Sequence, residues 1–340
     1  MKTLKDIATE LDISVSTVSR VVNNKSVVNN KTREKVMEAL AKTNYVPNQV
    51  ARSLKKSATK TIGVIVPDMC EVFFGQIIRG IDSAVSKKGY SILLADTNES
   101  KQKEERYLDI LFQQRVDALV LATVDMSGTT VMNYINNGVP VVFIDNLPAL
   151  NVPYDAVLID NVMAGKMAVN HFLSMGHKKI AAIVGIVAET TGSGRLEGYR
   201  MALREAGIPA DEDLIAYGNY KEDAGIACME KLLQNYEAHP FSAVCVMSEK
   251  MTIGAIKTIR KYGYRIPEDI ALVGFDMHDD TGLIVPSITT LRQPEKQIGE
   301  LTGEMLIKRL EERKNGTVSA NQKMFLMPYL EVHQSCGHKQ

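Results

Sequence analysis

The segment from Ser14 to Asn24, SVSTVSRVVNN, constrains this chain most, because its pattern fits a short helix with two distinct faces. Ser14 is a good N-cap, since its hydroxyl can accept a hydrogen bond from an otherwise unpaired backbone N–H group. Apolar side chains follow at helical spacing, at Val15, Val18, Val21 and Val22. Polar side chains take the other faces, at Ser16, Thr17, Ser19 and Arg20. Such a helix suits the DNA major groove, where hydroxyls hold phosphates and an arginine reaches a base edge.

Two further helices are expected beside it. The first precedes it, with apolar positions at Leu4, Ile7, Ala8 and Leu11. The turn between the two is Asp12-Ile13-Ser14, which has the length that a helix-turn-helix uses. A third helix over Lys31 to Thr43 turns its apolar residues inward, at Val36, Ala39 and Leu40. The sequence therefore predicts a small three-helix head.

The stretch TLKDIATELDISVSTVSRVVNN resembles the N-terminal signature of the lactose-repressor/galactose-repressor family of bacterial transcription regulators. The similarity continues through NYVPNQVARSLKKSATKTIGVIVPD, Asn44 to Asp68, and more loosely to about Val332. It implies an all-α helix-turn-helix DNA-binding domain at residues 1–46 and a hinge helix or linker at residues 47–60. Residues 61–340 are then an effector-binding and dimerisation domain.

The resemblance also implies how the head and hinge bind DNA. In the family the hinge helix orders on operator DNA, pairs with its dimer mate and wedges a leucine into the minor groove, and Leu54 matches that leucine. We expect Val15, Ser16 and Arg20 to read the major groove. The residues expected to position the DNA backbone are Thr3, Ser14, Thr17, Ser19, Asn23, Tyr45 and Asn48. Further DNA-binding candidates are Leu4 and Val50.

The charge distribution points the same way. The whole chain carries 40 basic and 40 acidic residues. Residues 1–60 contain twelve Lys/Arg and five Asp/Glu, a net charge of +7, so the remaining 280 residues carry −7. A basic head on an acidic body is typical of a nucleic-acid reader joined to a second function. A solvated basic face is the alternative explanation for the charge alone.

Length and composition set the class of protein. With 340 residues, 45% hydrophobic and 24% charged, the chain is an ordinary globular protein with two or three cores. Its four cysteines show no CxxC spacing, which favours free thiols in a reducing compartment. The N-terminal residues lack the apolar core of a signal peptide, and no apolar run approaches membrane-spanning length. We therefore expect a cytoplasmic protein.

From Thr61 onward, apolar strands alternate with amphipathic helices, which predicts parallel sheets covered on both faces. Two such sets in tandem predict an α/β body of two lobes, similar to periplasmic binding proteins, with a cleft between them. The resemblance implies that the lobes exchange chain. The expected first lobe is about 61–160 and 291–322, and the expected second lobe is about 161–290 and 323–335.

Ligands of such sheets bind outside the carboxyl ends of the strands. The expected effector-binding residues near those ends are Asp68, Phe73, Phe74, Asp160, Arg195, Tyr220, Ser248 and Asp276. Carboxylates and an arginine between aromatic walls suit a polyhydroxylated ligand. In sugar-responsive members of the family the positions matching Asp160, Arg195, Ser248 and Asp276 hold the ligand. This sequence has Ser248-Glu249 where those family members usually have Asn-Asp or Ser-Asp. For each carboxylate taken singly, the alternative role is that of a helix cap or a loop residue.

A purine is the alternative effector, because Phe73, Phe74 and Tyr220 match the aromatic positions of purine-responsive members. Glu189 stands where those members have a basic residue, which favours a sugar. A protein co-regulator is a further alternative. A sugar-binding transport protein would share the body, but it would need a signal peptide and would have no use for residues 1–60.

Enzyme hypotheses find little support. Gly192 to Gly198 reads GxGxxxG, one residue off the dinucleotide fingerprint, and lacks its early βαβ placement. Two clusters lack a recognised metal-ligand spacing: Asp276, His278, Asp279, Asp280 and His333, Cys336, His338. We therefore predict no catalytic residues, no metal and no cofactor apart from the effector itself.

The predicted function is a sequence-specific DNA-binding repressor of a carbohydrate-use operon, controlled allosterically by a sugar bound between the lobes. One small head buries too little surface for strong specificity, so a homodimer on a near-palindromic operator is expected. No leucine heptad follows Leu330, which predicts a dimer without a tetramerising tail.

Overall fold

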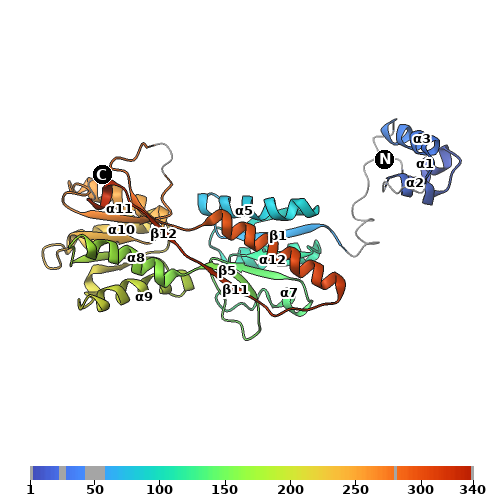
Figure 1. The fold of residues 1–340 in the computed structure, drawn as a ribbon. Helices are drawn as coiled ribbons and strands as arrows, with labels where there is room; N and C mark the ends of the chain where they lie inside the picture. The colour runs from blue at the N-terminus through green and yellow to red at the C-terminus, as the bar shows by residue number, and fades with distance from the viewer. Residues whose placement is uncertain (1–2, 23–27, 43–57, 279–281, 338–340) are drawn as a thin grey trace. The chain divides into compact units, whose positions relative to one another are not determined.

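The computed structural model describes residues 3–22, 28–42, 58–278 and 282–337. The chain divides into two compact units, Met1–Thr59 and Lys60–Gln340, shown in Figure 1. The expected hinge helix lies outside the described residues, and so do five predicted DNA-binding residues: Asn23, Tyr45, Asn48, Val50 and Leu54.

The first unit contains the three predicted helices, α1 (Leu4–Glu10), α2 (Val15–Val22) and α3 (Asn30–Lys42). Thr3 and Asp6 form a capping box at α1, in which the Thr3 hydroxyl accepts from the Asp6 N–H and the Asp6 carboxylate accepts from the Thr3 N–H. The three helices share one small core, made by Ile7, Ala8, Val18, Val21, Val36 and Ala39.

The first lobe of the second unit is a parallel sheet in the order β11-β5-β4-β3-β1-β2. Its strands are β1 (Thr61–Val66), β2 (Ser91–Asp96), β3 (Ala118–Leu121), β4 (Val141–Ile144), β5 (Asp155–Ile159) and β11 (Lys323–Leu326). Its helical segments are α5 (Val72–Val85), η1 (Ser86–Lys88), α6 (Lys101–Gln113), α7 (Met132–Asn136) and α12 (Glu295–Asn315). Four of these strands, β1, β3, β4 and β5, are almost wholly buried, as near-continuous apolar runs require.

The second lobe has the strand order β12-β10-β9-β8-β6-β7, with β12 antiparallel to β10. Its strands are β6 (Ile180–Val184), β7 (Ile215–Tyr217), β8 (Ala243–Val246), β9 (Ala271–Phe275), β10 (Thr289–Arg292) and β12 (Tyr329–Glu331). Its helical segments are α8 (Asn161–Ser174), α9 (Thr190–Glu205), η2 (Glu212–Leu214), α10 (Glu222–Gln234), α11 (Glu249–Lys261) and η3 (Gln334–Cys336). The strand order reverses beside β1 in one sheet and beside β6 in the other, which is where such sheets bind ligands.

The chain passes between the lobes after β5, after β10 and after β11 (Figure 1). The expected boundary at residue 323 is wrong, because β11 pairs with β5 in the first sheet, with Lys323 opposite Ala156. The outer edge of β5 needs a hydrogen-bonding partner, and the segment after α12 supplies it. Two side chains of the short β11, Met324 and Phe325, are exposed.

Three further features bear on the sequence predictions. All four cysteines are free, as expected, and only Cys70 is exposed. Among the described helices, none is long and apolar enough to span a membrane. The segment GxGxxxG lies within α9, where a Cβ on Gly198 would stand 2.0 Å from the Val162 carbonyl oxygen, so this glycine allows α9 to pack closely on α8.

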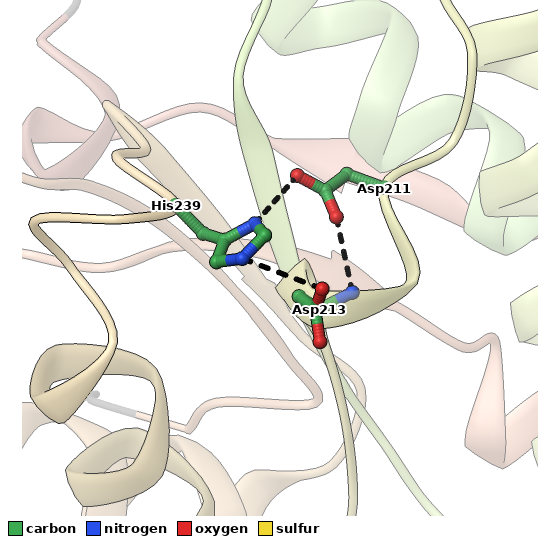
Figure 2. A group of neighbouring side chains, drawn as sticks. All are labelled: Asp211, Asp213 and His239. Atoms are coloured by element: carbon green, nitrogen blue, oxygen red, sulfur yellow. Dashed lines mark hydrogen bonds and ion pairs between the residues drawn. The ribbon is translucent and has the colours of Figure 1, made fainter.

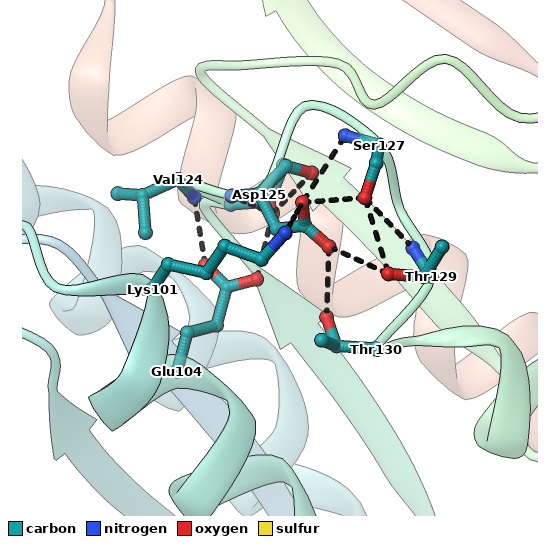
Figure 3. Close-up of polar contacts among 8 residues, drawn as sticks. Lys101, Glu104, Val124, Asp125, Ser127, Thr129 and Thr130 are labelled. Atoms are coloured by element: carbon teal, nitrogen blue, oxygen red, sulfur yellow. Dashed lines mark hydrogen bonds and ion pairs between the residues drawn. The ribbon is translucent and has the colours of Figure 1, made fainter.

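Polar side chains fix the loop that follows β3, as Figure 3 shows. The Asp125 carboxylate is buried, where it pairs with Lys101 Nζ at 2.8 Å and accepts from Ser127 Oγ at 2.6 Å. Burial opposes ionisation, but these bonds from Lys101 and Ser127 lower the pKa of Asp125 to about 2. Glu104 holds the same loop by accepting from the Val124 N–H at 2.7 Å. The loop at this end of the first sheet is therefore firmly anchored.

Helices α5 and α12 approach closely through glycines, and a pair of substitutions in α5 tests this. A Cβ on Gly80 would stand 2.6 Å from the Lys296 carbonyl oxygen, whereas one on Gly75 meets no atom within 4 Å. We expect Gly80→Ala to lower the free energy of unfolding by about 1–3 kcal/mol through overpacking. Gly75→Ala should instead raise it by about 0.5–1 kcal/mol, because alanine is the better helix former. Urea denaturation of the full chain measures both; changes of the same sign would contradict the packing argument.

Candidate functional site

The outer face of α2 carries the side chains predicted to read DNA. Ser14 begins the helix as expected, since its hydroxyl accepts from the Thr17 N–H at 3.1 Å and bonds the Ser16 hydroxyl at 2.7 Å. Ser16 and Arg20 are exposed. Val15 is 44% exposed, so it lies outside the apolar stripe in which the spacing placed it. An exposed valine beside these polar groups suits contact with a thymine methyl.

The other predicted DNA-binding residues of the head are less exposed or have other roles. Thr17 and Ser19 are half-buried. Thr3 caps α1, and Leu4 packs against the three-helix core. Leu4 therefore has a structural role in the head.

A cavity lies between the two lobes, at the carboxyl ends of their strands, with a volume of about 590 Å³ including its open mouth. Its lining residues are Pro67, Glu71, Phe73, Phe74, Glu99, Asp145, Asn146, Glu189, Thr191, Arg195, Tyr220, Ser248, Glu249, Phe275, Asp276 and Gln293. Both lobes contribute, so a ligand here would contact both.

Six of the eight residues predicted for the cleft line this cavity: Phe73, Phe74, Arg195, Tyr220, Ser248 and Asp276. Asp160 does not, because its carboxylate caps α8 and accepts from the Met163 N–H at 2.8 Å. Asp68 also lies outside the lining, where it pairs with Lys250 of the other lobe. Ser248 lines the cavity while capping α11.

Arg195 is fixed at the centre of the cavity wall. Its side chain is buried, Nε donates to Asn161 Oδ1 at 2.9 Å, and Nη1 donates to the Met247 carbonyl oxygen at 2.8 Å. The guanidinium lies over the Phe275 ring, with Cζ 3.7 Å from the ring centroid. These two bonds use two of its five N–H donors. A preorganised guanidinium of this kind suits recognition of ligand hydroxyls.

Asp276 faces the cavity from the end of β9, held in place by Gln293. The Gln293 N–H donates to Asp276 Oδ1 at 3.0 Å, and its Nε2 donates to Oδ2 at 2.6 Å. Burial raises the pKa of Asp276 to about 7, against the opposing effects of Gln293 and Arg195. Its backbone φ of 50° lies in the left-handed region, which non-glycine residues seldom occupy.

Aromatic side chains form the cavity walls. The Phe73 and Phe74 rings meet edge to face, with centroids 4.9 Å apart. The Tyr220 hydroxyl bonds Thr191 Oγ1 at 2.9 Å, and a Cβ on Gly185 would stand 1.9 Å from its ring. The tyrosine therefore depends on a glycine at the end of β6 for its position.

Sequence reasoning missed much of the acidic part of the cavity. It did not assign Glu71, Glu99, Asp145 or Glu249 to the site, and it used Glu189 only as an argument against a purine. Asp145 directly follows β4, so the strand-end rule applied to every strand would have found it. Glu99 lies three residues beyond β2, after a turn whose path the sequence does not show.

Burial and mutual repulsion keep these carboxyl groups partly protonated. Burial, with repulsion from Glu189, Asp145, Glu71 and Asp68, raises the pKa of Glu99 to about 8. Burial likewise raises the pKa of Glu71 and of Glu189 to about 7 and that of Asp145 to about 6. Ionisation of these carboxyl groups near neutral pH therefore costs free energy in the folded protein.

A prediction follows for stability against pH. A carboxyl group whose pKa is raised on folding stabilises the protein below its unfolded pKa, and this contribution is lost as pH rises through its folded pKa. For Glu99 that window runs from about pH 4.5 to about 8. We expect Glu99→Gln to raise Tm by a few degrees at pH 8 and to leave it nearly unchanged at pH 5. Calorimetry at both pH values measures this, and an equal shift at the two would contradict the assignment.

Hydrogen bonds and ion pairs join the lobes around the cavity. Asn146 of the first lobe donates to Glu189 Oε2 at 3.0 Å and accepts from the Thr191 N–H at 3.2 Å. Across the mouth, Lys250 of α11 pairs with Asp68 and, at 3.5 Å, with Glu71. Any change in the lobe arrangement must alter these contacts.

One group elsewhere brings potential metal ligands together, as Figure 2 shows. His239 Nδ1 lies 3.1 Å from Asp211 Oδ2, and His239 Nε2 lies 3.3 Å from Asp213 Oδ2. Both ring nitrogens already face carboxylate oxygens at these distances. Of the two clusters weighed from the sequence, Asp279, Asp280 and His338 fall outside the described residues.

Comparisons with known proteins agree with this geometry. Residues 3–48 match the family described as bacterial regulatory proteins, lacI family, and residues 59–329 match periplasmic binding proteins and the sugar binding domain of the LacI family. The chain belongs to the LacI family. The family, fold class and DNA-binding regulatory function predicted from the sequence are thereby confirmed.

Individual LacI-family relatives cover more than nine tenths of the chain. The HTH-type transcriptional repressor CytR of Escherichia coli (strain K12) is 34% identical over 318 residues, which is 93% of this chain and 92% of CytR. The structure of the transcriptional regulator CelR with cellobiose is 30% identical, with a TM-score of 0.74, and covers 98% of this chain and 100% of that chain. The structure of the Lac repressor dimer bound to operator and the anti-inducer ONPF is 26% identical, with a TM-score of 0.84. It covers 98% of this chain and 99% of that chain. These relatives are transcription regulators.

Proposed function

We propose that this LacI-family regulator represses a carbohydrate-use operon as a homodimer, and that a small hydroxylated effector in the interlobe cavity sets its affinity for operator DNA. One observation carries the proposal: a single chain joins a head presenting Arg20 on its exposed helix to a cavity built around Arg195. On this proposal the protein acts on DNA in the cytoplasm, has no enzyme activity and needs no metal or further cofactor.

The edge of the first sheet supports dimer formation. Leu93 and Leu94 of the edge strand β2 are 41% and 42% exposed. Other apolar side chains near the start of α5 are also exposed. A strand edge with exposed leucines needs a partner surface. Two heads on one dimer would also explain how so small a reading unit reaches specificity on a near-palindromic site.

The allosteric step follows from the interlobe contacts. A ligand can change DNA affinity only if it binds two lobe arrangements with different affinities. Contacts from Asn146 to Glu189 and Thr191 join the lobes directly beside the cavity. We propose that effector binding shifts these contacts and thereby the distance between the two hinge segments of the dimer.

Two experiments test this function. Selection of DNA sites from a random library with the full-length protein should return a near-palindromic sequence, and the absence of any enriched site would overturn the proposal. A thermal-shift panel of sugars, sugar phosphates and purines should then find an effector. A ligand at about 100 times its Kd adds roughly 2.7 kcal/mol to the folded state. Stabilisation by a purine alone would favour the purine alternative.

Arg20→Ala is expected to weaken binding to the selected site by about 1–3 kcal/mol and to relax specificity at one base position. Binding to random DNA should change little, because phosphate contacts supply most of that affinity. Competition assays at one fixed salt concentration compare the two. Lys5→Ala, an exposed change on α1, is the control. Equal losses on specific and random DNA would contradict a base contact by Arg20.

A further inference from the structure

The cavity carries far more acid than a neutral ligand requires. Six lining residues bear carboxyl groups: Glu71, Glu99, Asp145, Glu189, Glu249 and Asp276. Among the described lining residues, Arg195 is the only one with a cationic side chain. Buried charge is costly unless it is paired. A neutral sugar would leave this excess of negative charge in place.

Three of these residues lack a basic neighbour of their own, and we name Glu99, Asp145 and Glu189 the acidic corner. The charges that act on Glu99 are all carboxylates. The one cation that acts on Asp145 is Arg195, whose guanidinium already donates to Asn161 and Met247. Glu189 shares the charge of that same Arg195 and accepts from Asn146 at 3.0 Å, a neutral donor. Glu71 differs, because Lys250 lies 3.5 Å away.

The acidic corner is assembled from three separate places in the fold. Glu99 follows β2, Asp145 follows β4, and Glu189 stands before the first turn of α9 in the other lobe. The backbones of Glu99 and Asp145 have φ values of 60° and 62°. A left-handed backbone at a non-glycine residue is unfavourable and persists where the surroundings enforce it. The fold therefore brings these carboxyl groups together at an energetic cost, inside a cavity with aromatic walls.

The spacing of the carboxylates favours an amine over a metal ion. In the described part of the chain, the one group of three His/Cys/Asp/Glu residues with ligand atoms within 4.8 Å of one another is Asp211, Asp213 and His239. Calcium and magnesium bind oxygen at roughly 2.0–2.6 Å, which needs ligands as close as that. An ammonium group accepts longer bonds, of roughly 2.7–3.2 Å, and can be held by two carboxylates.

We propose that the effector is an amino sugar whose protonated amine binds among Glu99, Asp145 and Glu189 while its hydroxyl groups bind Arg195 and Asp276. This inference rests on the proposed effector role of the cavity and adds a chemical class to it. The amine would bridge the lobes, because Glu189 lies in one lobe and Glu99 and Asp145 lie in the other. Effector binding would thus be coupled directly to the lobe arrangement.

Matched sets of three sugars test the charge without changing the ring. The full-length protein is titrated calorimetrically with glucosamine, glucose and N-acetylglucosamine, and with the corresponding galactose and mannose sets, in buffer containing EDTA. The amine of at least one set should bind at least about tenfold more tightly than its hydroxyl and acetamide counterparts, since a bond to a charged group is worth about 1.5–3 kcal/mol.

Variants then locate the amine. Glu99→Gln and Asp145→Asn should each weaken binding of the amine about tenfold or more and leave the acetamide counterpart nearly unaffected. Glu205→Gln is the control, because Glu205 pairs with Lys166 on the outside of α8 and α9. Melting curves of the unliganded variants show that they are folded, and removal of an unpaired carboxyl group should raise Tm.

The outcomes separate this inference from the proposed function. Equal binding of the amine and neutral sugars would overturn the amine and leave a sugar effector in place. Three other results would also overturn the amino-sugar proposal: none of the amino sugars binds, putrescine binds while no sugar does, or calcium raises the melting temperature in a way that EDTA abolishes. Failure of the wild-type protein to select any DNA site would instead count against the proposed regulator.

Discussion

Asp155→Ala is expected to lower the free energy of unfolding of the body by about 2–4 kcal/mol, because it removes a bidentate pair of charge-assisted hydrogen bonds from Arg309, which keeps its bonds to Glu312. Asp155 is 3% exposed, and its two carboxylate oxygens accept from Arg309 Nε at 2.7 Å and Nη2 at 2.8 Å. The Gln322 N–H donates to the same carboxylate at 2.8 Å. One side chain thus ties together β5, α12 and the segment leading into β11.

The loss should also affect the crossover between the lobes. Arg309 donates further to Glu312, to Ser319 and to the Ala320 carbonyl oxygen, so it organises the whole turn after α12. Without Asp155, the segment that pairs β11 with β5 loses its anchor. Hydrogen exchange at β11 should therefore rise more than at β3, which lies deeper in the sheet.

Thermal unfolding with and without the substitution measures this effect, and a fall in Tm of about 10 °C is expected for a body of this size. Glu311→Ala is the matched control, since Glu311 lies on the same helix but pairs with Lys88 at the surface. Exposed ion pairs contribute little. Similar shifts for the two variants would show that the Asp155–Arg309 pair has no special role.

The sequence predicted the elements whose signals are local. The head was predicted closely because capping, turn length and helical spacing act over a few residues, as at Ser14 and Val18. The two lobes followed from apolar strands alternating with helices. Asp276 was found because it directly follows a strand, where parallel sheets bind ligands, whereas the role of Arg195, which lies within α9, came from the family resemblance.

The remainder depends on contacts between distant segments. Strand β11 forms because β5 exposes a free edge, and nothing within Lys323–Leu326 indicates that partner. Asp160 caps a helix, because its carboxylate accepts a hydrogen bond from the Met163 N–H. In the sequence alone, a carboxylate that precedes a helix fits a ligand contact and a helix cap equally well. Glu99 and Asp145 meet Glu189 only through the closure of the lobes. The sequence alone therefore does not show that these three acidic residues line the same cavity.

Arg195→Ala should abolish the response to the effector and leave binding to operator DNA intact. Arg195 is the one cationic side chain among the described residues that line the cavity, and Asn161, Met247 and Phe275 hold it in place. Loss of two charge-assisted hydrogen bonds to a ligand should weaken effector binding by at least about 100-fold. Arg195→Lys should recover little, because an ammonium lacks the planar fork of a guanidinium.

The control for Arg195 lies on the same helix. Arg200 of α9 pairs with Glu212 at 2.7 Å, and its side chain is 40% exposed. Arg200→Ala should keep the effector response. The measurement is DNA affinity with and without effector for each variant, at one salt concentration, together with a melting curve. If Arg195→Ala loses effector and DNA binding together while remaining folded, the prediction that Arg195 acts in effector recognition and not in DNA binding fails.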